Sequence, residues 1–284
     1  MSTISKPRPR LTARAFRHVA LAAAAVIFAF PFVWMFCGIF KTNDEIWRTP
    51  YRLLPASLDC KALFENLSAL GLGRSMANSL FVGVAGTLST LAVSSLFAYA
   101  AVFLRNRWTD FLFRLVLLTY MLPAAVTYVP SYVILARLGL LNTHTGLIFS
   151  YLANVFSVFY LRQAFRRVNK DFIDAARIDG SSEAGILARV IVPLNVSSLS
   201  SIGMLTFIGL YNSYMWPSVM LSRPEKYLIS QGLRLFFIQD GAYGLNWGQI
   251  MLACAVALLP IIVLFLAVRE WFLSSIAEDS GVKS

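Results

Sequence analysis

The sequence predicts an all-α membrane protein with six transmembrane helices. Only 14% of the 284 residues are charged and 58% are hydrophobic, whereas soluble domains carry about a quarter charged residues. Several apolar runs exceed the roughly 20 residues that a helix needs to cross a bilayer. Lysine and arginine gather at the ends of these runs, which is typical of the positive-inside rule.

A basic tail precedes the first predicted span. Residues 1–17 contain lysine and arginine but no acidic residue, and an apolar run follows from His18 to Phe40. A basic tail before an alanine-rich run is also typical of a signal peptide. This run is longer than the core of a signal peptide and further spans follow, so we expect a retained helix. The polar stretch from Lys41 to Arg74 is then an external loop.

The second and third predicted spans flank a short basic loop. Ser75 to Leu104 is the second span, Arg105 to Asp110 is the loop, and Phe111 to Ala136 is the third span. Pro123 and Pro130 interrupt the third span. Broken helices are tolerated at membrane depth where they contact protein or line a cavity. A kink without a functional role is the alternative.

Three further spans complete the predicted membrane domain. A tight external turn from Leu138 to Thr143 leads to the fourth span, Gly146 to Phe165. The fifth span is Leu199 to Leu221 and the sixth is Gln249 to Val268. An external loop from Ser222 to Trp247 joins these last two spans.

An even number of spans places both ends of the chain on the same side of the membrane. Of the 25 lysines and arginines, 16 lie on that side. The positive-inside rule therefore assigns it to the cytoplasm. We expect one membrane domain, residues 18–272, between two cytoplasmic tails, residues 1–17 and 273–284.

A polar stretch, residues 171–194, separates the fourth and fifth spans. Apolar residues recur at helical spacing in both of its halves and predict two short helices. Gly180 can adopt a positive φ at the turn between them, and Asp179 or Ser181 can cap the second helix. Pro193 marks the end of the second helix.

The first of these short helices has the features of a docking surface. Ala175 and Ala176 allow another surface to approach closely, and charged side chains such as Asp174 and Arg177 surround them. A solvated helical hairpin between two spans is the alternative interpretation.

The order of residues in this stretch resembles the EAA loop of permease subunits in binding-protein-dependent ABC importers. The family pattern is Glu-Ala-Ala, two residues, Asp-Gly-Ala and, further along, Ile-x-Leu-Pro. Asp174 stands in place of the family glutamate, Ser181 in place of the alanine and Val192 in place of the leucine. The matching positions are Ala175, Ala176, Asp179, Gly180, Ile191 and Pro193.

The resemblance implies the fold of a type I ABC importer permease in a bacterial or archaeal cytoplasmic membrane. Such a permease works with a second permease, two ATPase subunits and an extracytoplasmic solute-binding protein. The ATPases bind ATP and Mg²⁺, and we expect this chain to bind no cofactor or metal. The EAA loop becomes the helix that couples to the ATPase, which implies coupling roles for Asp174, Ala175, Ala176, Asp179, Gly180, Ser181 and Pro193.

The sequence carries no motif for catalysis of its own. It lacks the phosphate-binding pattern Gly-x-x-x-x-Gly-Lys-Ser/Thr. Its acidic residues lie in loops and tails, whereas proton-coupled carriers bury ionisable residues in their spans. This weighs against the alternative interpretation, a carrier or channel that works without an ATPase. The net charge of +11 lies at span ends rather than in a nucleic-acid-binding patch, and the three cysteines predict neither a disulfide nor a metal site.

A carbohydrate is the expected substrate. The turn from Leu138 to Thr143 resembles the carbohydrate branch of the family, which also includes glycerol-3-phosphate importers. We see no deep basic residue in spans four to six for a phosphate, so glycerol-3-phosphate is the alternative to a neutral sugar. Sugars need hydrogen bonds and aromatic faces, although each aromatic or amide residue could instead be a helix contact. The candidates on spans three to five are Tyr128, Tyr132, Asn154, Tyr211, Asn212 and Trp216.

Overall fold

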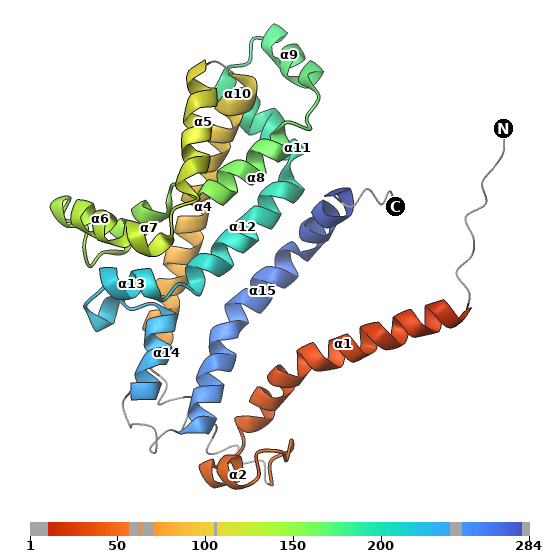
Figure 1. The fold of residues 1–284 in the computed structure, drawn as a ribbon, viewed down its shortest axis with the longest axis vertical. Coiled ribbons are helices and arrows are strands. Elements are labelled where there is room, and N and C mark those ends of the chain that lie inside the picture. Colours follow the sequence, from red (N-terminus) through yellow and green to blue (C-terminus); the bar gives the residue numbers. More distant parts are fainter. Residues whose placement is uncertain are drawn as a thin grey trace. The chain divides into compact units, whose positions relative to one another are not determined.

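The computed structural model consists of helices and their connections, and it describes residues 11–56, 63, 67, 71–104, 107–238 and 246–279. No β-strand occurs in these ranges (Figure 1). The chain divides into two compact units. The first comprises Met1–Gly71 and Phe237–Val256, and the second comprises Leu72–Phe236 and Ala257–Ser284.

The first unit contains the long helix α1 (Leu11–Gly38), the short helix α2 (Asn43–Arg48) and the first turns of α15 (Trp247–Asp279). The ring of Trp47 lies edge-on to the ring of Trp247, with 6.0 Å between their centroids. This contact joins the segment after the first predicted span to the first residue of α15.

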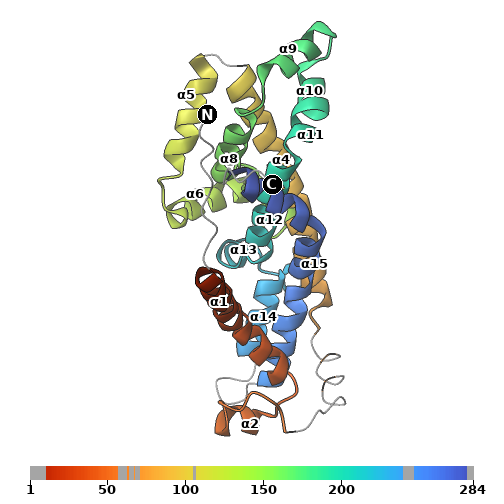
Figure 2. The ribbon, with the colours of Figure 1, turned by 90° about the vertical axis from the view of Figure 1, so that its right-hand side faces the viewer.

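The second unit is built around α4 (Gly73–Phe103), which packs against α8 (Val155–Phe165) and α12 (Val196–Tyr211) (Figure 1, Figure 2). The buried face of α4 consists largely of small and hydroxyl-bearing residues, among them the fully buried Ser79 and Thr90. Small side chains let neighbouring helices approach closely inside a membrane. This face therefore explains why α4 can lie at the centre of the unit.

Three predicted spans, the third, the fourth and the fifth, are broken in the structure. The third consists of α5 (Arg107–Thr119) and α6 (Ala124–Arg137), and Pro123 occupies the cap position before α6, as its interruption of the span predicted. The fourth consists of α7 (His144–Tyr151) and α8, which are bent by 48° relative to each other. Asn154 lies at this bend and its side chain accepts a hydrogen bond from Ser157 N–H at 2.9 Å, which caps α8.

The predicted fifth span, Leu199 to Leu221, consists of most of α12 and the separate helix α13 (Met215–Met220). The predicted external loop after it contains a 3₁₀ turn (Pro224–Lys226) and α14 (Ile229–Ile238), which the sequence did not predict. The N–H of Ile229 donates to the hydroxyl of Ser79 on α4 at 2.7 Å. The start of α14 is therefore packed against α4 rather than extended as a simple connection.

The number of membrane spans is supported in part. By length and composition, three of the described helices can cross a membrane, or up to five can if each bent pair counts as one span. The count of six spans thus stays a prediction. The sixth predicted span, residues 249–268, lies inside α15, which continues to Asp279 and so extends into the predicted tail.

Candidate coupling site

The polar stretch between the fourth and fifth predicted spans folds into the short helices that its periodicity predicts. α9 (Lys170–Ile178) forms the first half. α10 (Glu183–Ile186), a π-helical turn (Leu187–Ile191) and α11 (Val192–Leu194) form the second half. Pro193 lies within α11, where this second half ends. We call residues 170–194 the coupling loop.

The second half of the coupling loop meets α12 at almost a right angle. The segment Glu183–Leu194 is bent by 86° relative to Val196–Tyr211. Asn195 lies buried at this corner, and its side-chain N–H donates to the carbonyl of Ile191 at 2.8 Å. The corner is therefore fixed by a hydrogen bond from the residue at which the chain changes direction.

Gly180 forms the turn between the two halves, as predicted. Its φ is 76°, a conformation that glycine adopts at little cost. Its N–H donates to the carbonyl of Arg177, and the N–H of Ser181 donates to the carbonyl of Ala176, both at 3.0 Å. These two bonds are a Schellman motif, which satisfies the last carbonyls of α9. The cap of α10 is Ser182, which accepts from Gly185 N–H at 3.2 Å, so the prediction of Asp179 or Ser181 as the cap is wrong.

α9 has one face on the protein and one face exposed. Ile173 is buried in a hydrophobic cluster that is described below, and Ala176 is partly buried against that cluster. Ala175 is exposed, together with Phe172 and Ile178, whose exposed fractions are 57% and 86%. The predicted docking pair of alanines is therefore divided between the two faces, and Phe172 and Ile178 supply most of the exposed apolar surface.

A polar network joins both halves of the coupling loop to α4. The guanidinium of Arg177 donates to both carboxylate oxygens of Glu183, from Nε at 3.0 Å and from the terminal nitrogen at 3.2 Å. The hydroxyl of Tyr99 on α4 donates to the same carboxylate. Asp174 lies 3.7 Å from Arg177 on the other side. The bond to Glu183 raises the pKa of the Arg177 guanidinium.

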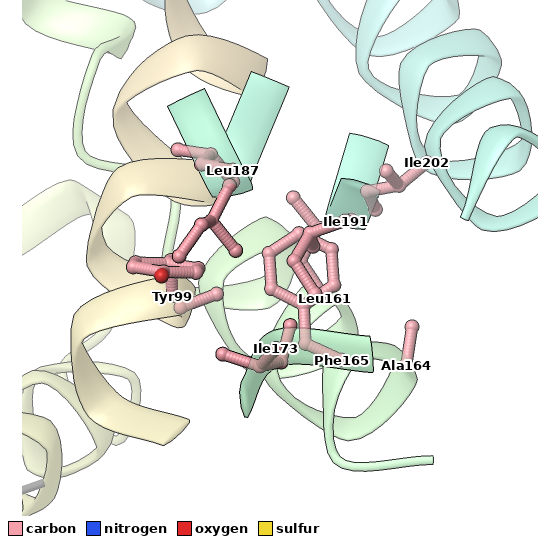
Figure 3. Packing of buried hydrophobic residues seen from close by; sticks show 10 residues of the cluster. Tyr99, Leu161, Ala164, Phe165, Ile173, Leu187, Ile191 and Ile202 are labelled. Carbon is pink, nitrogen blue, oxygen red and sulfur yellow. The ribbon is translucent and has the colours of Figure 1, made fainter. Parts of the chain in front are cut away.

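Beneath this network, a hydrophobic cluster connects the coupling loop to three long helices. Ile173 comes from α9, Leu187 and Ile191 come from the π-helical turn, and the other members come from α4, α8, α10 and α12 (Figure 3). The cluster comprises Ala98, Tyr99, Leu161, Ala164, Phe165, Ile173, Ile186, Leu187, Ile191 and Ile202. Because protein interiors are close-packed, a displacement of α9 must be accommodated by these helices.

Not all residues predicted for coupling take part in the same contacts. Asp174 pairs within the loop, through Arg177. Asp179 is the C-cap residue of α9, and Ser181 contributes its backbone to the turn. The two residues that complete the network, Tyr99 and Glu183, were not among those predicted for coupling.

Of the six residues predicted to contact the substrate, two form a pair in the structure and four lie at separate positions. The rings of Tyr128 on α6 and Trp216 on α13 lie 5.1 Å apart, and Trp216 Nε1–H donates to the Ser150 hydroxyl at 2.8 Å. Nearby in the fold, the hydroxyls of Tyr151 and Ser213 are hydrogen-bonded at 2.9 Å. This arrangement supplies an aromatic surface with hydroxyl groups attached to it.

The remaining candidates have structural contacts or stand alone. Tyr211 is buried, stacks on Phe207 and donates to the carbonyl of Ala257 at 3.0 Å. Asn154 caps α8, as described above. Tyr132 and Asn212 are exposed. The structure therefore brings together only Tyr128 and Trp216 of the six candidates.

Comparison with known proteins identifies relatives of the whole chain. The family model described as "Binding-protein-dependent transport system inner membrane component" matches residues 91–278. This range includes the coupling loop and all of α15 except its last residue. The sn-glycerol-3-phosphate transport system permease protein UgpE of Yersinia pestis bv. Antiqua (strain Antiqua) is 29% identical over 274 residues, covering 93% of this chain and 96% of that protein. The lactose transport system permease protein LacG of Rhizobium radiobacter is 29% identical over 272 residues, covering 96% of each.

A solved structure shares the fold. A chain from the crystal structure of a bacterial ABC transporter involved in the import of the acidic polysaccharide alginate superposes with a TM-score of 0.81. The match covers 94% of this chain and 100% of that chain, at 24% sequence identity.

Proposed function

The chain belongs to the family of binding-protein-dependent transport system inner membrane components, and we propose that it forms half of the translocation pathway of an ATP-driven sugar importer. The chain is thus a permease subunit with a type I ABC importer fold. The observation that carries the coupling part of the proposal is the loop that exposes α9 and joins it to α4 through Tyr99, Glu183 and Arg177.

In this proposal, the exposed face of α9 enters a cleft on a partner ATPase. Phe172, Ala175 and Ile178 supply the apolar contact, and Asp174 and Asp179 lie at its rim. ATP and Mg²⁺ are bound by the ATPase, so this chain is a non-catalytic subunit. Closure of the ATPases displaces the coupling loop, and the hydrophobic cluster passes the displacement to α4, α8 and α12.

The proposed complex contains a second permease, two ATPase subunits and an extracytoplasmic solute-binding protein. The description of the family supports dependence on a binding protein. It also supports a position in the inner membrane, where we propose that the coupling loop and both ends of the chain face the cytoplasm.

For the substrate we propose a neutral sugar or oligosaccharide. The aromatic pair Tyr128 and Trp216, with the hydroxyls of Ser150 and Tyr151 close by in the fold, offers the apolar face and the hydrogen bonds that a sugar needs. The lactose permease relative supports this substrate class.

Glycerol-3-phosphate is a second candidate that one contact favours. The guanidinium of Arg234 on α14 lies 5.9 Å from the centre of the Tyr214 ring, and the neighbouring Ser230 hydroxyl donates to the carbonyl of Ser213 at 2.6 Å. The guanidinium of Arg234 could donate charge-assisted hydrogen bonds to the phosphate group of such a solute. The UgpE relatives transport this class of solute by name.

The variant Arg234→Gln separates the two substrates. In the reconstituted complex, we expect it to leave uptake of a neutral sugar within about twofold of the wild type, because hydrogen bonding and not charge holds the sugar. A phosphate ester would instead lose roughly tenfold or more, as expected for a charge-assisted bond. Uptake of radiolabelled lactose and glycerol-3-phosphate measures both. Wild-type uptake of glycerol-3-phosphate without uptake of lactose, with that uptake lost in Arg234→Gln, would replace the sugar proposal.

Dependence on partners tests the function itself. The purified chain in liposomes should show no solute flux, and ATP-driven uptake should require the second permease, the ATPase and the solute-binding protein. Robust flux through the single chain would show that it is a carrier or channel and would overturn the importer proposal.

A further inference from the structure

A large basic cavity lies where α4, α8 and α9 meet in the second unit. Its volume is about 740 Å³. Its wall includes Phe103 at the end of α4 and the basic side chains of Arg162, Arg166, Lys170 and Arg177. We call it the basic cavity.

The basic cavity lies at the level where apolar helices end. Phe103 is the last residue of the long apolar helix α4, and α8, the second half of a bent span, ends at Phe165. α5 begins at the same end of α4, as Figure 1 shows, and its first turn exposes Trp108 with an exposed fraction of 61%. Tryptophan is enriched where a bilayer meets water. Because α4 and the bent pair of α7 and α8 are candidate membrane spans, we expect the cavity to lie at the depth of lipid head groups.

The charge of the cavity wall is strongly positive. Asp174 is the acidic member of the wall, and it already lies beside Arg177, which also binds Glu183. Within the described part of the chain, neither Arg166 nor Lys170 pairs with a carboxylate. Clustered cations attract an anion that offers several acceptor oxygens.

Arg162 links the basic cavity to α5. Its guanidinium lies 4.0 Å from the centre of the Phe113 ring on α5. Elsewhere on α5, Phe111, Leu115 and Leu118 are exposed, with fractions of 56%, 47% and 60%. A basic cavity beside exposed apolar side chains fits a head group with its acyl chains.

We propose that the basic cavity binds the phosphate of an anionic phospholipid. Phosphate oxygens contact Arg166, Lys170 and Arg162, and the acyl chains lie along α5. An acidic side chain of the ATPase is the competing occupant. The geometry favours the lipid because the cavity adjoins helix ends, whereas the apolar side chains available to the ATPase lie on the exposed face of α9.

Lipid selectivity of the full-length chain tests this proposal. The probe is phosphatidylglycerol in competition with phosphatidylcholine, with the bound lipids counted by native mass spectrometry after release from mixed nanodiscs. We expect the wild type to retain phosphatidylglycerol preferentially. The double variant Arg166→Gln/Lys170→Gln should lose about tenfold or more of that preference, since each basic group near a membrane surface contributes severalfold to anionic-lipid binding.

The matched control is Arg223→Gln/Lys226→Gln, which removes the same charge from the loop after α13 and should keep the preference. The conservative pair Arg166→Lys/Lys170→Arg should also keep it, which separates charge from folding. Equal retention of the two lipids by the wild type, or an unchanged preference in the Gln double variant, overturns the proposal. Displacement of the lipid by millimolar inorganic phosphate would identify a site for free anions instead. If the Gln double variant no longer co-purifies with the ATPase but keeps its lipid preference, the cavity is a site for the partner protein instead.

Discussion

At the scale of single residues, the coupling loop depends on the backbone of Gly180. A β-branched residue at φ 76° carries a conformational cost on the order of 1–3 kcal/mol. No atom outside the turn lies within 4 Å of the position of an added Cβ, so the cost comes from the backbone and not from a collision. We expect Gly180→Val to abolish transport while the protein still inserts into the membrane, as measured by uptake and by abundance in the membrane fraction.

The matched control at this position is Gly180→Asn. Asparagine adopts the left-handed region more readily than other non-glycine residues, so it should keep a substantial part of the transport. Normal co-purification of the ATPase and normal uptake in Gly180→Val would refute a coupling role for this turn.

The carboxylate of Glu183 carries a second prediction. Arg177 and Glu183 side chains are 38% and 43% exposed, so their pairing contributes about 1 kcal/mol or less to stability. We expect Glu183→Gln to leave thermal unfolding almost unchanged but to lower the amount of solute transported per ATP hydrolysed, because the link between α9 and α4 is weakened. Asp171→Asn removes the same charge outside this network and should preserve the ratio. A normal ratio in Glu183→Gln, or an equal loss in the control, would contradict the prediction.

The difference between Gly180 and Glu183 shows what sequence can predict at this scale. Gly180 follows from local chemistry, because a glycine between two periodic segments indicates a turn. One partner of Glu183 is Tyr99, which is 84 positions away in the chain. An acidic residue just after a helix cap was a visible signal, but nothing local identifies a partner at that separation.

At the scale of elements, the two faces of α9 have different roles. Ile173 packs inside the protein, whereas Phe172 and Ile178 are exposed and available for docking. Ile173→Ala removes buried side-chain volume and should destabilise the protein by about 2–5 kcal/mol. Phe172→Ala and Ile178→Ala change exposed positions and should alter stability by about 0.5 kcal/mol or less. We expect these two variants to reduce co-purification of the ATPase while the midpoint of thermal unfolding stays the same. Undiminished co-purification in the double variant would move the docking surface away from this face.

Sequence predicted the elements best where proline, glycine or long apolar runs decided them. The break before α6 follows from Pro123, and the long helices α4 and α15 follow from their composition. The bend between α7 and α8 was not predicted, because its cause is the side chain of Asn154 acting as a cap inside an apolar run. α14 was missed for a related reason, since its first residue depends on a hydrogen bond to Ser79 in a distant helix.

At the scale of the whole molecule, orientation in the membrane is the remaining prediction. The excess of basic residues predicts that the coupling loop faces the cytoplasm and that Thr49 lies outside. In a background without native cysteines, we expect a membrane-impermeant maleimide added to right-side-out spheroplasts to label Thr49→Cys and not Ser181→Cys. Both should react after the membrane is permeabilised. The reverse pattern would invert the topology.

The corner at Asn195 gives the coupling loop a mechanical direction. The segment Glu183–Leu194 projects from α12 at 86°, so a force on this segment acts on α12 through a lever arm. A sideways push on α10 therefore exerts a torque about the long axis of α12, while a push parallel to that axis tilts α12. The first motion changes which side of α12 faces its neighbours without moving its ends. In the proposed complex, the direction in which the ATPase pushes would therefore decide whether the far end of α12, where Tyr211 and Asn212 lie, rotates in place or is displaced sideways.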